Sequence, residues 1–293
     1  MSLKQFIDDH LPKLEEVLYD LVRNIKAPAQ LKESMLYSLE AGGKRIRPLF
    51  VLAVCDLFHN NKKNEAYIVG AAVEMIHTYS LIHDDLPSMD DDEMRRGKPT
   101  NHVIFGDALA TLAGDALNTL SFGVLARMES VTSEKKVELI NLLSIAAGAE
   151  GMVGGQVLDI DGESRTLSLP ELENVHVNKT GALLRFSIES GAILSDATVQ
   201  ERSALVEYAH HIGLAFQIQD DILDIVGTTE ELGKTAGKDI ESHKSTYPAL
   251  LTLEGAKQKL EEHYELAITA LRKIDKNTTI LEEFAQYIVK RHN

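Results

Sequence analysis

The stretch EAYIVGAAVEMIHTYSLIHDDLPSMDDDEMRRG, residues 65–97, joins a long apolar segment to a dense cluster of charged residues. Its first part carries apolar residues on more than one helical face, which is typical of a helix surrounded by other helices. The residue before a proline is disfavoured in a helix, so Pro87 predicts a helix end near Asp85. We therefore predict a central helix over residues 64–85 that carries carboxylates at its own C-terminal end.

The same helical periodicity runs through nearly all of the chain, and strand-like alternation between turns is missing. Helix-start signals of capping-box spacing pair Ser168 with Glu171, Thr198 with Glu201 and Thr279 with Glu282. Helices are predicted over about 2–25, 29–41, 48–59, 64–85, 101–129, 133–158, 170–194, 198–226, 244–252, 255–274 and 278–291. Because no linker rich in Pro, Gly or Ser divides the sequence, we expect a single all-α domain, residues 1–293, built as one large helical bundle.

The composition is that of a folded protein with a large core, since 44% of the residues are hydrophobic and 26% are charged. The net charge of −15 argues against nucleic acid as a partner, because a phosphate backbone needs a basic surface. A phosphorylated small molecule is compatible with this charge, since it needs only a local basic cluster.

The single cysteine, Cys55, excludes an internal disulfide and suits a reducing compartment. Its apolar, helical setting predicts a buried thiol rather than a nucleophile. The first residues lack the apolar core of a signal peptide, and no uncharged apolar run is long enough to span a bilayer. We expect a soluble, cytoplasmic protein without a membrane span.

The first acidic cluster begins with Asp84 and Asp85 at the end of the central helix. Carboxylates are disfavoured there, because the helix dipole is negative at the C-terminus. Further acids follow in the next loop, namely Asp90, Asp91, Asp92 and Glu93. A solvated acidic turn would explain the loop alone, but the misplaced pair favours a metal site. Oxygen ligands suit a hard cation such as Mg²⁺ or Mn²⁺ better than Zn²⁺.

The second acidic cluster lies in FQIQDDILD, residues 216–224. Asp220 and Asp224 are four residues apart and share one face of an apolar helix with Gln217, while Asp221 lies beside them. Buried carboxylates need partners, so salt bridges to lysines and a cation site are the alternatives. Three acids on one face favour the cation site, and two such clusters predict facing walls of one cavity.

Basic residues accompany both acidic clusters. Lys44 and Arg47 lie in GGKRIRP before a predicted helix, and Arg95 and Arg96 directly follow the first acidic cluster. The remaining candidates are Lys179 beside Thr180, Lys234, Lys238 and Lys244. A single lysine is usually a surface residue. The arginines are more informative, because a guanidinium matches the oxygens of a phosphate group.

The two acidic clusters have the DDxxxxD and DDxxD spacings of the trans-isoprenyl diphosphate synthases, and the first is followed by RRG. The chain is similar from end to end to the bacterial-type farnesyl diphosphate synthases. The similarity runs through GGKRIRP, MIHTYSLIHDDLPSMDDD, GGQVLDI, NKTGALL, FQIQDDILD, LGKTAGKD and KSTYPALL. The resemblance implies an all-α bundle around a deep cavity, usually as a homodimer, that condenses isopentenyl diphosphate with allylic diphosphates.

The resemblance also implies a role for individual residues. Those holding Mg²⁺, or Mn²⁺ in its place, would be Asp84, Asp85, Asp90, Asp220, Asp221 and Asp224. Those contacting the allylic diphosphate would be Arg95, Lys179, Lys234 and Lys244. Those binding isopentenyl diphosphate would be Lys44, Arg47, His77 and Arg96, with Thr180 and Gln217 near the carbocation. The catalytic set would be Asp84, Asp85, Asp90, Arg95, Lys179, Asp220 and Lys234.

Product length is expected to depend on the helix that carries Asp84, because the product tail grows down the cavity away from the metal. Tyr79 and Ser80 lie about one turn before the acidic cluster. An aromatic residue at the position of Tyr79 goes with short products in the family that the chain resembles. We therefore expect a C15 product, farnesyl diphosphate.

Four other functions remain as alternatives. A geranylgeranyl or longer-chain synthase differs only in the depth of the cavity. A terpene cyclase does not need the GGKRIRP segment, and its second metal site normally has a different pattern. A non-catalytic helical partner subunit would have degenerate aspartate motifs, and a plain metal-binding module leaves the arginines unexplained. No specific role is assigned to Asp91, Asp92 and Glu93.

Overall fold

Helix α4, Lys63–Asp84, stands in the middle of the computed structural model and packs against α1, α2, α3, α6 and α10. The structure describes residues 1–60, 63–226 and 245–291. Most residues of α4 are buried over its whole length, including both faces of its central part. This confirms the prediction of a central helix over residues 64–85, since an apolar surface on every side needs neighbours on every side.

The other elements of the described ranges are almost all helical, which confirms the predicted all-α class. In chain order they are α1 (Leu3–Arg23), α2 (Ala29–Leu39), α3 (Ile46–Leu57), α5 (Asn101–Phe105), α6 (Asp107–Ala126), α7 (Ser133–Ala147), α8 (Met152–Gly162), α9 (Leu169–His176), the π-helical turn η1 (Val177–Gly181), α10 (Ala182–Leu194), α11 (Val199–Val226), α14 (Tyr247–Leu271) and α15 (Thr279–Lys290). Two short strands, β1 (Met94–Arg95) and β2 (Lys98–Pro99), form an antiparallel hairpin.

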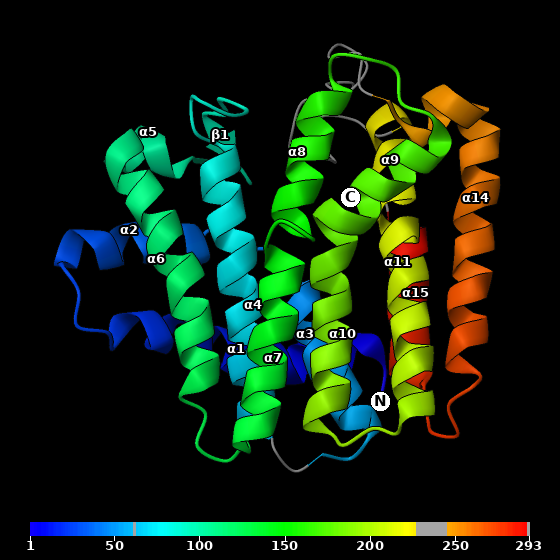
Figure 1. Ribbon diagram of the computed structural model, residues 1–293, viewed down its shortest axis with the longest axis horizontal. Helices are drawn as coiled ribbons and strands as arrows, with labels where there is room; N and C mark the ends of the chain where they lie inside the picture. Colours follow the sequence, from blue (N-terminus) through cyan, green and yellow to red (C-terminus); the bar gives the residue numbers. More distant parts are fainter. Residues whose placement is uncertain (61–62, 227–244, 292–293) are drawn as a thin grey trace.

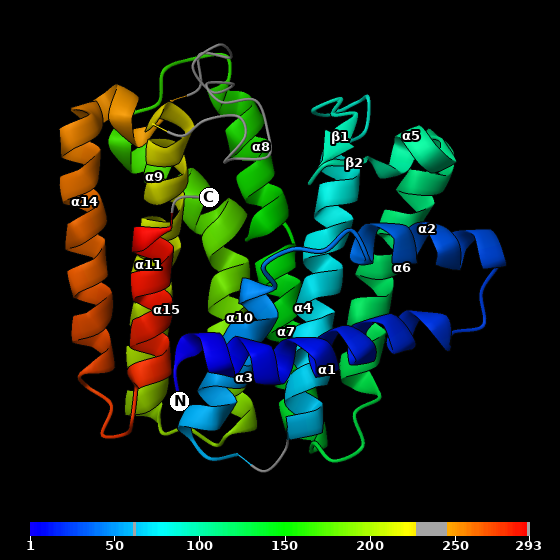
Figure 2. The same cartoon turned by 180° about the vertical axis from the view of Figure 1, so that it is seen from behind.

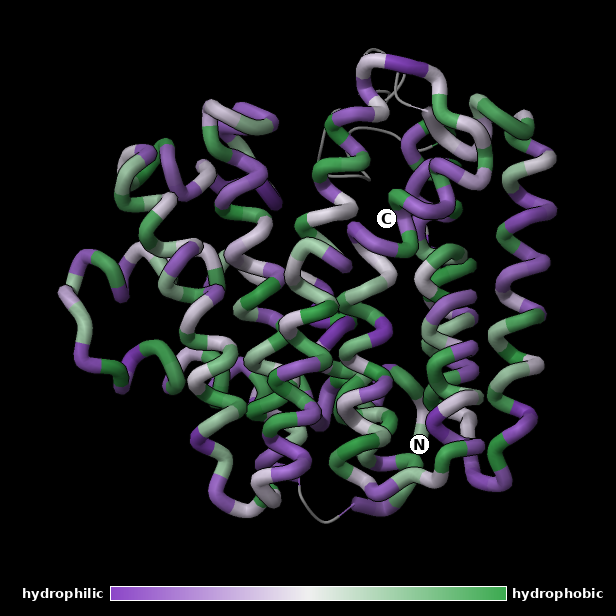
Figure 3. The backbone as a smooth tube through the Cα atoms, in the orientation of Figure 1, coloured by the Kyte–Doolittle hydropathy of each residue, from purple (hydrophilic) through white to green (hydrophobic). Residues whose placement is uncertain are grey.

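The long helices stand side by side as a bundle, and α1 crosses behind them (Figures 1 and 2). Helices α4 and α11 run in the same direction, so their C-terminal ends reach the same end of the bundle, close to the hairpin and α8 (Figure 1). Hydrophilic residues gather at this end and at the turns, while hydrophobic ones follow the inner helices (Figure 3). Function is therefore expected where helix ends and polar residues meet.

Several predicted helices are interrupted at glycines. The predicted helix 101–129 is divided at Gly106, whose φ of 79° is a conformation that favours glycine. The predicted helix 133–158 is divided between α7 and α8, where a side chain at Gly151 would lie 2.3 Å from the carbonyl oxygen of Ala146. The periodicity does not reveal these breaks, because the apolar pattern continues on both sides of each one.

Two of the three predicted capping boxes are confirmed. The Glu171 carboxylate accepts from the backbone N–H of Ser168, and Glu201 accepts from Thr198 in the same way. The third is wrong by one residue, since the N-cap of α15 is Thr278. Its hydroxyl donates to the Glu282 carboxylate at 2.6 Å, four residues later rather than three.

The predicted burial of the thiol is confirmed. Cys55 is 2% exposed on α3, and burial raises the pKa of its thiol to about 12. Such a thiol stays protonated and is a poor nucleophile.

Two stretches, Asp107–Ala126 and Ser133–Gly162, are long and apolar enough to cross a membrane by length and composition alone. Of their most apolar windows, 44% and 33% are buried within the bundle. The second stretch is also divided between α7 and α8. The buried core helices of soluble proteins can be equally long and apolar, so the two stretches are only weak evidence for a membrane span.

Candidate active site

Two adjoining cavities lie at the end of the bundle where α4 and α11 finish. They share four lining residues, Arg47, His77, Leu81 and Thr180, which come from α3, α4 and η1. Five lysine and arginine side chains line one cavity, which we call the basic cavity, and the lining surface of the other, the apolar cavity, is mostly apolar. The shared residues therefore place the two cavities next to each other.

The basic cavity has a volume of about 460 Å³. Its polar lining consists of Lys44, Arg45, Arg47, Glu74, His77, Arg95, Arg96, Thr180 and Gln217. The Nε of Arg47 is buried without a hydrogen-bond partner in the described parts of the chain. Burial lowers the pKa of His77 well below its usual value, and Arg47 and Arg96 lower it further. His77 is therefore a neutral imidazole among cations, and the cavity has donors to spare for an anion.

The double glycine of GGKRIRP has a steric reason. Arg96 donates to the carbonyl oxygen of Gly42, and its guanidinium lies against Gly43. A Cβ at Gly43 would lie 2.7 Å from Nη1 of Arg96, and the φ of 141° at this residue also disfavours a side chain. The glycines thus let a basic residue from the hairpin pack directly on the segment that carries Lys44.

The segment that carries Lys44 and Arg47 is fixed by a buried ion pair that the sequence analysis missed. Arg45 has a left-handed backbone, and its guanidinium donates to the Glu74 carboxylate of α4 at 2.7 Å. The side chains of Arg45 and Glu74 are 0% and 3% exposed. An arginine between two other predicted bases gave no signal that its side chain turns inward.

The apolar cavity has a volume of about 560 Å³. Tyr79, His83 and Asp84 of α4 line it together with residues of α8, and Leu86 and Lys179 also contribute to its lining. Ser80 is also a lining residue. Tyr79 is 8% exposed, so its ring fills space within the structure rather than projecting into solvent.

Asp84 carries an electrostatic signature of a cation site. Burial raises the pKa of its carboxyl to about 6, and Asp90 and Asp85 act in the same direction, against Lys179 and Arg95. The backbone N–H of Asp90 donates to the carbonyl oxygen of Asp84 at 2.9 Å, which folds the acidic loop back onto the helix end. A partly desolvated carboxylate beside other carboxylates fits a hard cation such as Mg²⁺.

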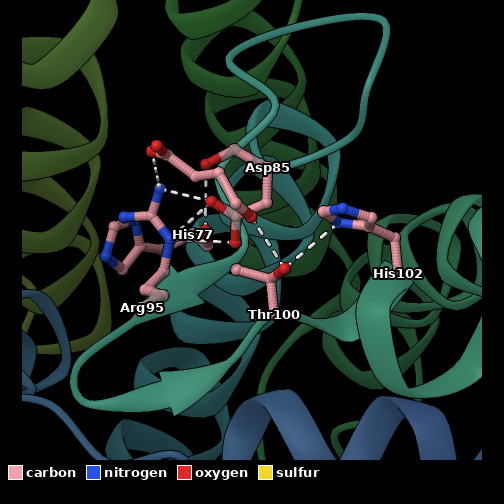
Figure 4. A network of polar contacts seen from close by, with 7 residues as sticks. His77, Asp85, Arg95, Thr100 and His102 are labelled. Atoms are coloured by element: carbon pink, nitrogen blue, oxygen red, sulfur yellow. Dashed lines mark hydrogen bonds and ion pairs between the residues drawn. The ribbon is translucent and has the colours of Figure 1, made fainter.

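Asp85 and Arg95 are paired with each other. The Nε of Arg95 lies 2.8 and 2.9 Å from the two carboxylate oxygens, and Figure 4 shows the guanidinium against the Asp85 side chain.

Thr100, which follows the hairpin, binds the backbone of the acidic loop. Its hydroxyl donates to the Asp92 carbonyl oxygen at 2.7 Å. The backbone N–H of Thr100 also donates to the Glu93 carbonyl oxygen at 2.9 Å. The backbone of this acidic stretch therefore anchors the hairpin that carries Arg95 and Arg96.

The second acidic cluster is tied to two later segments. Asp220 lies 2.5 Å from a guanidinium nitrogen of Arg291, which also packs over the ring of Phe216 at 3.9 Å. Asp221 accepts from the backbone N–H of Tyr247 at 2.8 Å and so holds the start of α14. Asp224 is buried, with 4% of its surface exposed. The contact of Arg291 with Asp220 is not apparent from the sequence, because spacing does not reveal which distant segment packs against α11.

Lys179 and Thr180 lie on the π-helical turn η1. The Nζ of Lys179 lies 2.7 Å from a carboxylate oxygen of Asp159 on α8. A Cβ at Gly155 would lie 2.2 Å from the backbone nitrogen of Lys179, so glycine is what lets α8 approach η1. The wider turn points both Lys179 and Thr180 into the cavities, a placement that π-turns often serve at functional sites.

Most of the predicted substrate-binding residues line the two cavities, whereas Asp84 is the one predicted metal ligand that does so in the described parts of the chain. Lys234 and Lys244 lie outside the described residues. Within ranges 1–60, 63–226 and 245–291, no group of three or more His, Cys, Asp or Glu side chains is arranged to hold a metal by itself. Mg²⁺ commonly completes its coordination with water and substrate phosphates, so a set of carboxylates that is open before the substrate binds is compatible with it.

The known proteins that this chain is similar to are prenyl diphosphate synthases. Residues 28–284 match the polyprenyl synthetase family. The chain is 49% identical over 292 residues to the farnesyl diphosphate synthase of Bacillus subtilis, covering 99% of this chain and 98% of that one. It is 47% identical over 272 residues to a chloroplastic geranylgeranyl pyrophosphate synthase of Capsicum annuum, covering 92% of this chain and 73% of that one.

Solved structures give the same family of folds. A farnesyl and geranylfarnesyl diphosphate synthase of Zymomonas mobilis superimposes with a TM-score of 0.86 at 38% identity, with 98% of each chain covered. A geranyltransferase of Legionella pneumophila gives a TM-score of 0.88 at 34% identity, over 99% of this chain and 97% of that one. The predicted helical fold is confirmed by these likenesses.

Proposed function

Because the chain belongs to the polyprenyl synthetase family, we propose that it is a trans-prenyltransferase that makes (2E,6E)-farnesyl diphosphate. The substrates are isopentenyl diphosphate and the allylic dimethylallyl and geranyl diphosphates. One observation carries the proposal: a basic cavity and an apolar cavity share Arg47, His77, Leu81 and Thr180. Two diphosphate substrates need this combination, since each has an anionic head and an apolar tail.

The basic cavity is the proposed site of isopentenyl diphosphate. Lys44, Arg47 and Arg96 would bind its phosphates, with the buried Arg47 Nε among the donors. The neutral imidazole of His77 can donate one further hydrogen bond without adding charge. The diphosphate of this substrate would lie against these cations, and its double bond would be directed towards Thr180, which lines both cavities.

The allylic diphosphate is proposed to place its head near Asp84 and Lys179 and its tail in the apolar cavity. Mg²⁺, or Mn²⁺ in its place, would neutralise the diphosphate leaving group when it is bound. The residues proposed to hold the metal are Asp84, Asp85, Asp90, Asp220, Asp221 and Asp224. Arg95 and Lys179 would supply fixed positive charge to the same leaving group, and Lys234 and Lys244 are proposed to join them.

The condensation needs no protein nucleophile. The allylic C–O bond breaks, and its electron pair leaves with pyrophosphate. The double bond of isopentenyl diphosphate then forms the new C–C bond, and the proton lost from the adjacent carbon passes to the departed pyrophosphate. Thr180 and Gln217 line the basic cavity. Their side-chain oxygens are proposed to stabilise the positive charge that develops on the allylic group.

The size of the product separates farnesyl diphosphate synthesis from its nearest alternative. Tyr79 is almost fully buried in the wall of the apolar cavity, which supports a short tail. A geranylgeranyl or longer-chain synthase would need that space to be open. The terpene cyclase and the non-catalytic partner are disfavoured, because the basic cavity would have no use in either of them.

The organisation of the protein is part of the same proposal. We propose one domain over residues 1–293, a homodimer, and a soluble cytoplasmic enzyme that binds no nucleic acid and has no membrane span. Light scattering on the purified full chain would measure its mass against the 32.4 kDa of one chain. A monomeric mass would contradict the homodimer without affecting the proposed reaction.

Pyrophosphate release tests the proposed reaction. The full chain, given isopentenyl diphosphate, dimethylallyl diphosphate and Mg²⁺, should release pyrophosphate only when both substrates are present. Asp84→Asn and Asp220→Asn should each lower kcat by about a hundred-fold or more. Asp8→Asn, on an exposed side chain of α1, is the matched control and should leave the rate unchanged. Release from a single substrate would indicate hydrolysis or cyclisation and contradict the proposal.

A further inference from the structure

We infer that His83, seated against Gly114, is a further determinant of product length, because it holds the ring of Tyr79 at the floor of the apolar cavity. The inference rests on the proposed function, since it concerns which product the site releases. It is carried by contacts of His83 with Tyr79 and with the backbone of α6.

His83 and Tyr79 are neighbours on one face of α4, four residues apart. Their ring centroids are 5.5 Å apart and their planes meet at 82°, which is a favourable edge-to-face arrangement. Both side chains line the apolar cavity, on the wall that also carries Asp84. The contact therefore lies in the space that a growing product tail would enter.

The ring of His83 is anchored on its other side by α6. Its Nε2 lies 3.0 Å from the carbonyl oxygen of Thr111. A carbonyl oxygen only accepts hydrogen bonds, so Nε2 carries the hydrogen and the ring orientation is fixed. His83 thus fills the space between Tyr79 and the backbone of α6, and leaves the tyrosine ring less room to turn aside.

Gly114 provides the seat for this ring. A Cβ at Gly114 would lie 2.2 Å from Nε2 and 2.5 Å from Cδ2 of His83. Glycine is a poor helix former compared with alanine, yet it occupies the interior of α6 at this point. Close approach to His83 gives a physical reason for it. Any larger residue would force the imidazole away from Thr111.

Product sizing on the full-length enzyme tests the inference. With isopentenyl and geranyl diphosphates and Mg²⁺, His83→Ala should raise the ratio of C20 to C15 product by about ten-fold or more, which is what extra space for apolar groups is worth in a pocket. His83→Gln keeps a donor for Thr111 but lacks the ring, so it should also raise the ratio. His210→Ala, an exposed histidine of α11, is the control and should leave the ratio unchanged.

The role of Gly114 is tested by combining variants. Gly114→Ala should change the ratio of C20 to C15 product only through His83, so the double variant with His83→Ala should match His83→Ala alone. A merely structural role would lower the yield of all products together and leave their ratio constant.

The possible failures are distinct. If the unaltered enzyme condenses no substrate, the proposed function fails. If it makes C15 product and the active His83→Ala and His83→Gln variants keep the same ratio, the inference is overturned.

Discussion

A guanidinium nitrogen of Arg291 lies 2.5 Å from a carboxylate oxygen of Asp220. The end of the chain thus reaches the acidic cluster proposed to bind metal. The same guanidinium donates to the Phe216 carbonyl oxygen at 3.0 Å and is 5% exposed, so it is held in place. A fixed cation thus stands beside Asp220, where it would compete with Mg²⁺.

Replacing Arg291 should therefore lower the Mg²⁺ concentration that the enzyme needs for activity. Asp220 is 41% exposed, so solvent screens the pair and the effect is modest. In Arg291→Gln, the Mg²⁺ concentration for half-maximal activity should fall by about two- to five-fold. Arg272→Gln, at an exposed position after α14, is the control. A higher requirement for Mg²⁺ in Arg291→Gln would show that Arg291 assists metal binding instead.

The buried pair of Arg45 and Glu74 should be important for both stability and substrate binding. Glu74→Gln leaves Glu15, 3.5 Å from the Arg45 Nε, as the remaining carboxylate partner of the guanidinium. The unfolding free energy should fall by up to about 3–5 kcal/mol. The segment carrying Lys44 would also loosen, so KM for isopentenyl diphosphate should rise more than KM for the allylic substrate. Denaturant unfolding and separate titrations of the two substrates measure these effects.

The control for the buried pair is Glu16→Gln, since Glu16 and Lys13 form an exposed pair on α1. It should change the unfolding free energy little. Equal changes of both KM values in Glu74→Gln would mean that the pair supports the fold in general rather than the basic segment.

A histidine pair between α11 and α14 should make the stability depend on pH. The Nδ1 atoms of His211 and His263 lie 3.1 Å apart, so one must donate and the other accept. Burial, together with the neighbouring His211, lowers the pKa of His263 from 6.5 to about 4. The fold favours the neutral form, so this contribution to stability is complete above pH 6.5 and is lost as the pH falls to about 4.

The lowered pKa of His263 sets how much the unfolding free energy should change with pH. The unfolding free energy should be about 2 kcal/mol lower at about pH 5 than near pH 7. His263→Gln should weaken this dependence, measured by denaturant unfolding at both pH values. His59→Asn is the control, because His59 is exposed and asparagine tolerates its φ of 53°. An unchanged pH dependence in His263→Gln would exclude this pair as the cause.

Tyr79 should limit the product directly. Tyr79→Ala opens the apolar cavity below Asp84, so the main product should lengthen from C15 to C20. Ser80→Phe adds a ring at the neighbouring position and should shift the product towards C10. Chromatography of the dephosphorylated products measures both shifts. If Tyr79→Ala still stops at C15, the floor of the cavity is formed by other residues.

The sequence predicted the helical class and the central helix, because periodicity and the proline at 87 are local features. It did not predict the break at Gly106 or the π-helical turn at Lys179. The turn accompanies the close approach of Gly155 on α8 to η1, and the break at Gly106 depends on a positive φ that the apolar periodicity does not report. The predicted helices 244–252 and 255–274 appear as α14 with a non-helical Thr252, at a φ of 70°, near the predicted boundary.

The motifs predicted which residues gather, but not how they pair before substrates bind. Asp85 and Arg95 were assigned to different partners, and the structure joins them in a two-oxygen contact. Asp221 holds the backbone of Tyr247, and Arg291 reaches Asp220 from the end of the chain. Spacing reports which side chains share a helix face, whereas these contacts depend on how the helices are packed.

The central claim is that the two adjoining cavities condense two diphosphates into a C15 product. The most direct measurement gives the full-length protein radiolabelled isopentenyl diphosphate, dimethylallyl diphosphate and Mg²⁺, and separates the products by length. We expect farnesyl diphosphate as the main end product, and no condensation product when Mg²⁺ is chelated. A C20 or longer end product would contradict the proposed length, and no condensation at all would contradict the proposed enzyme.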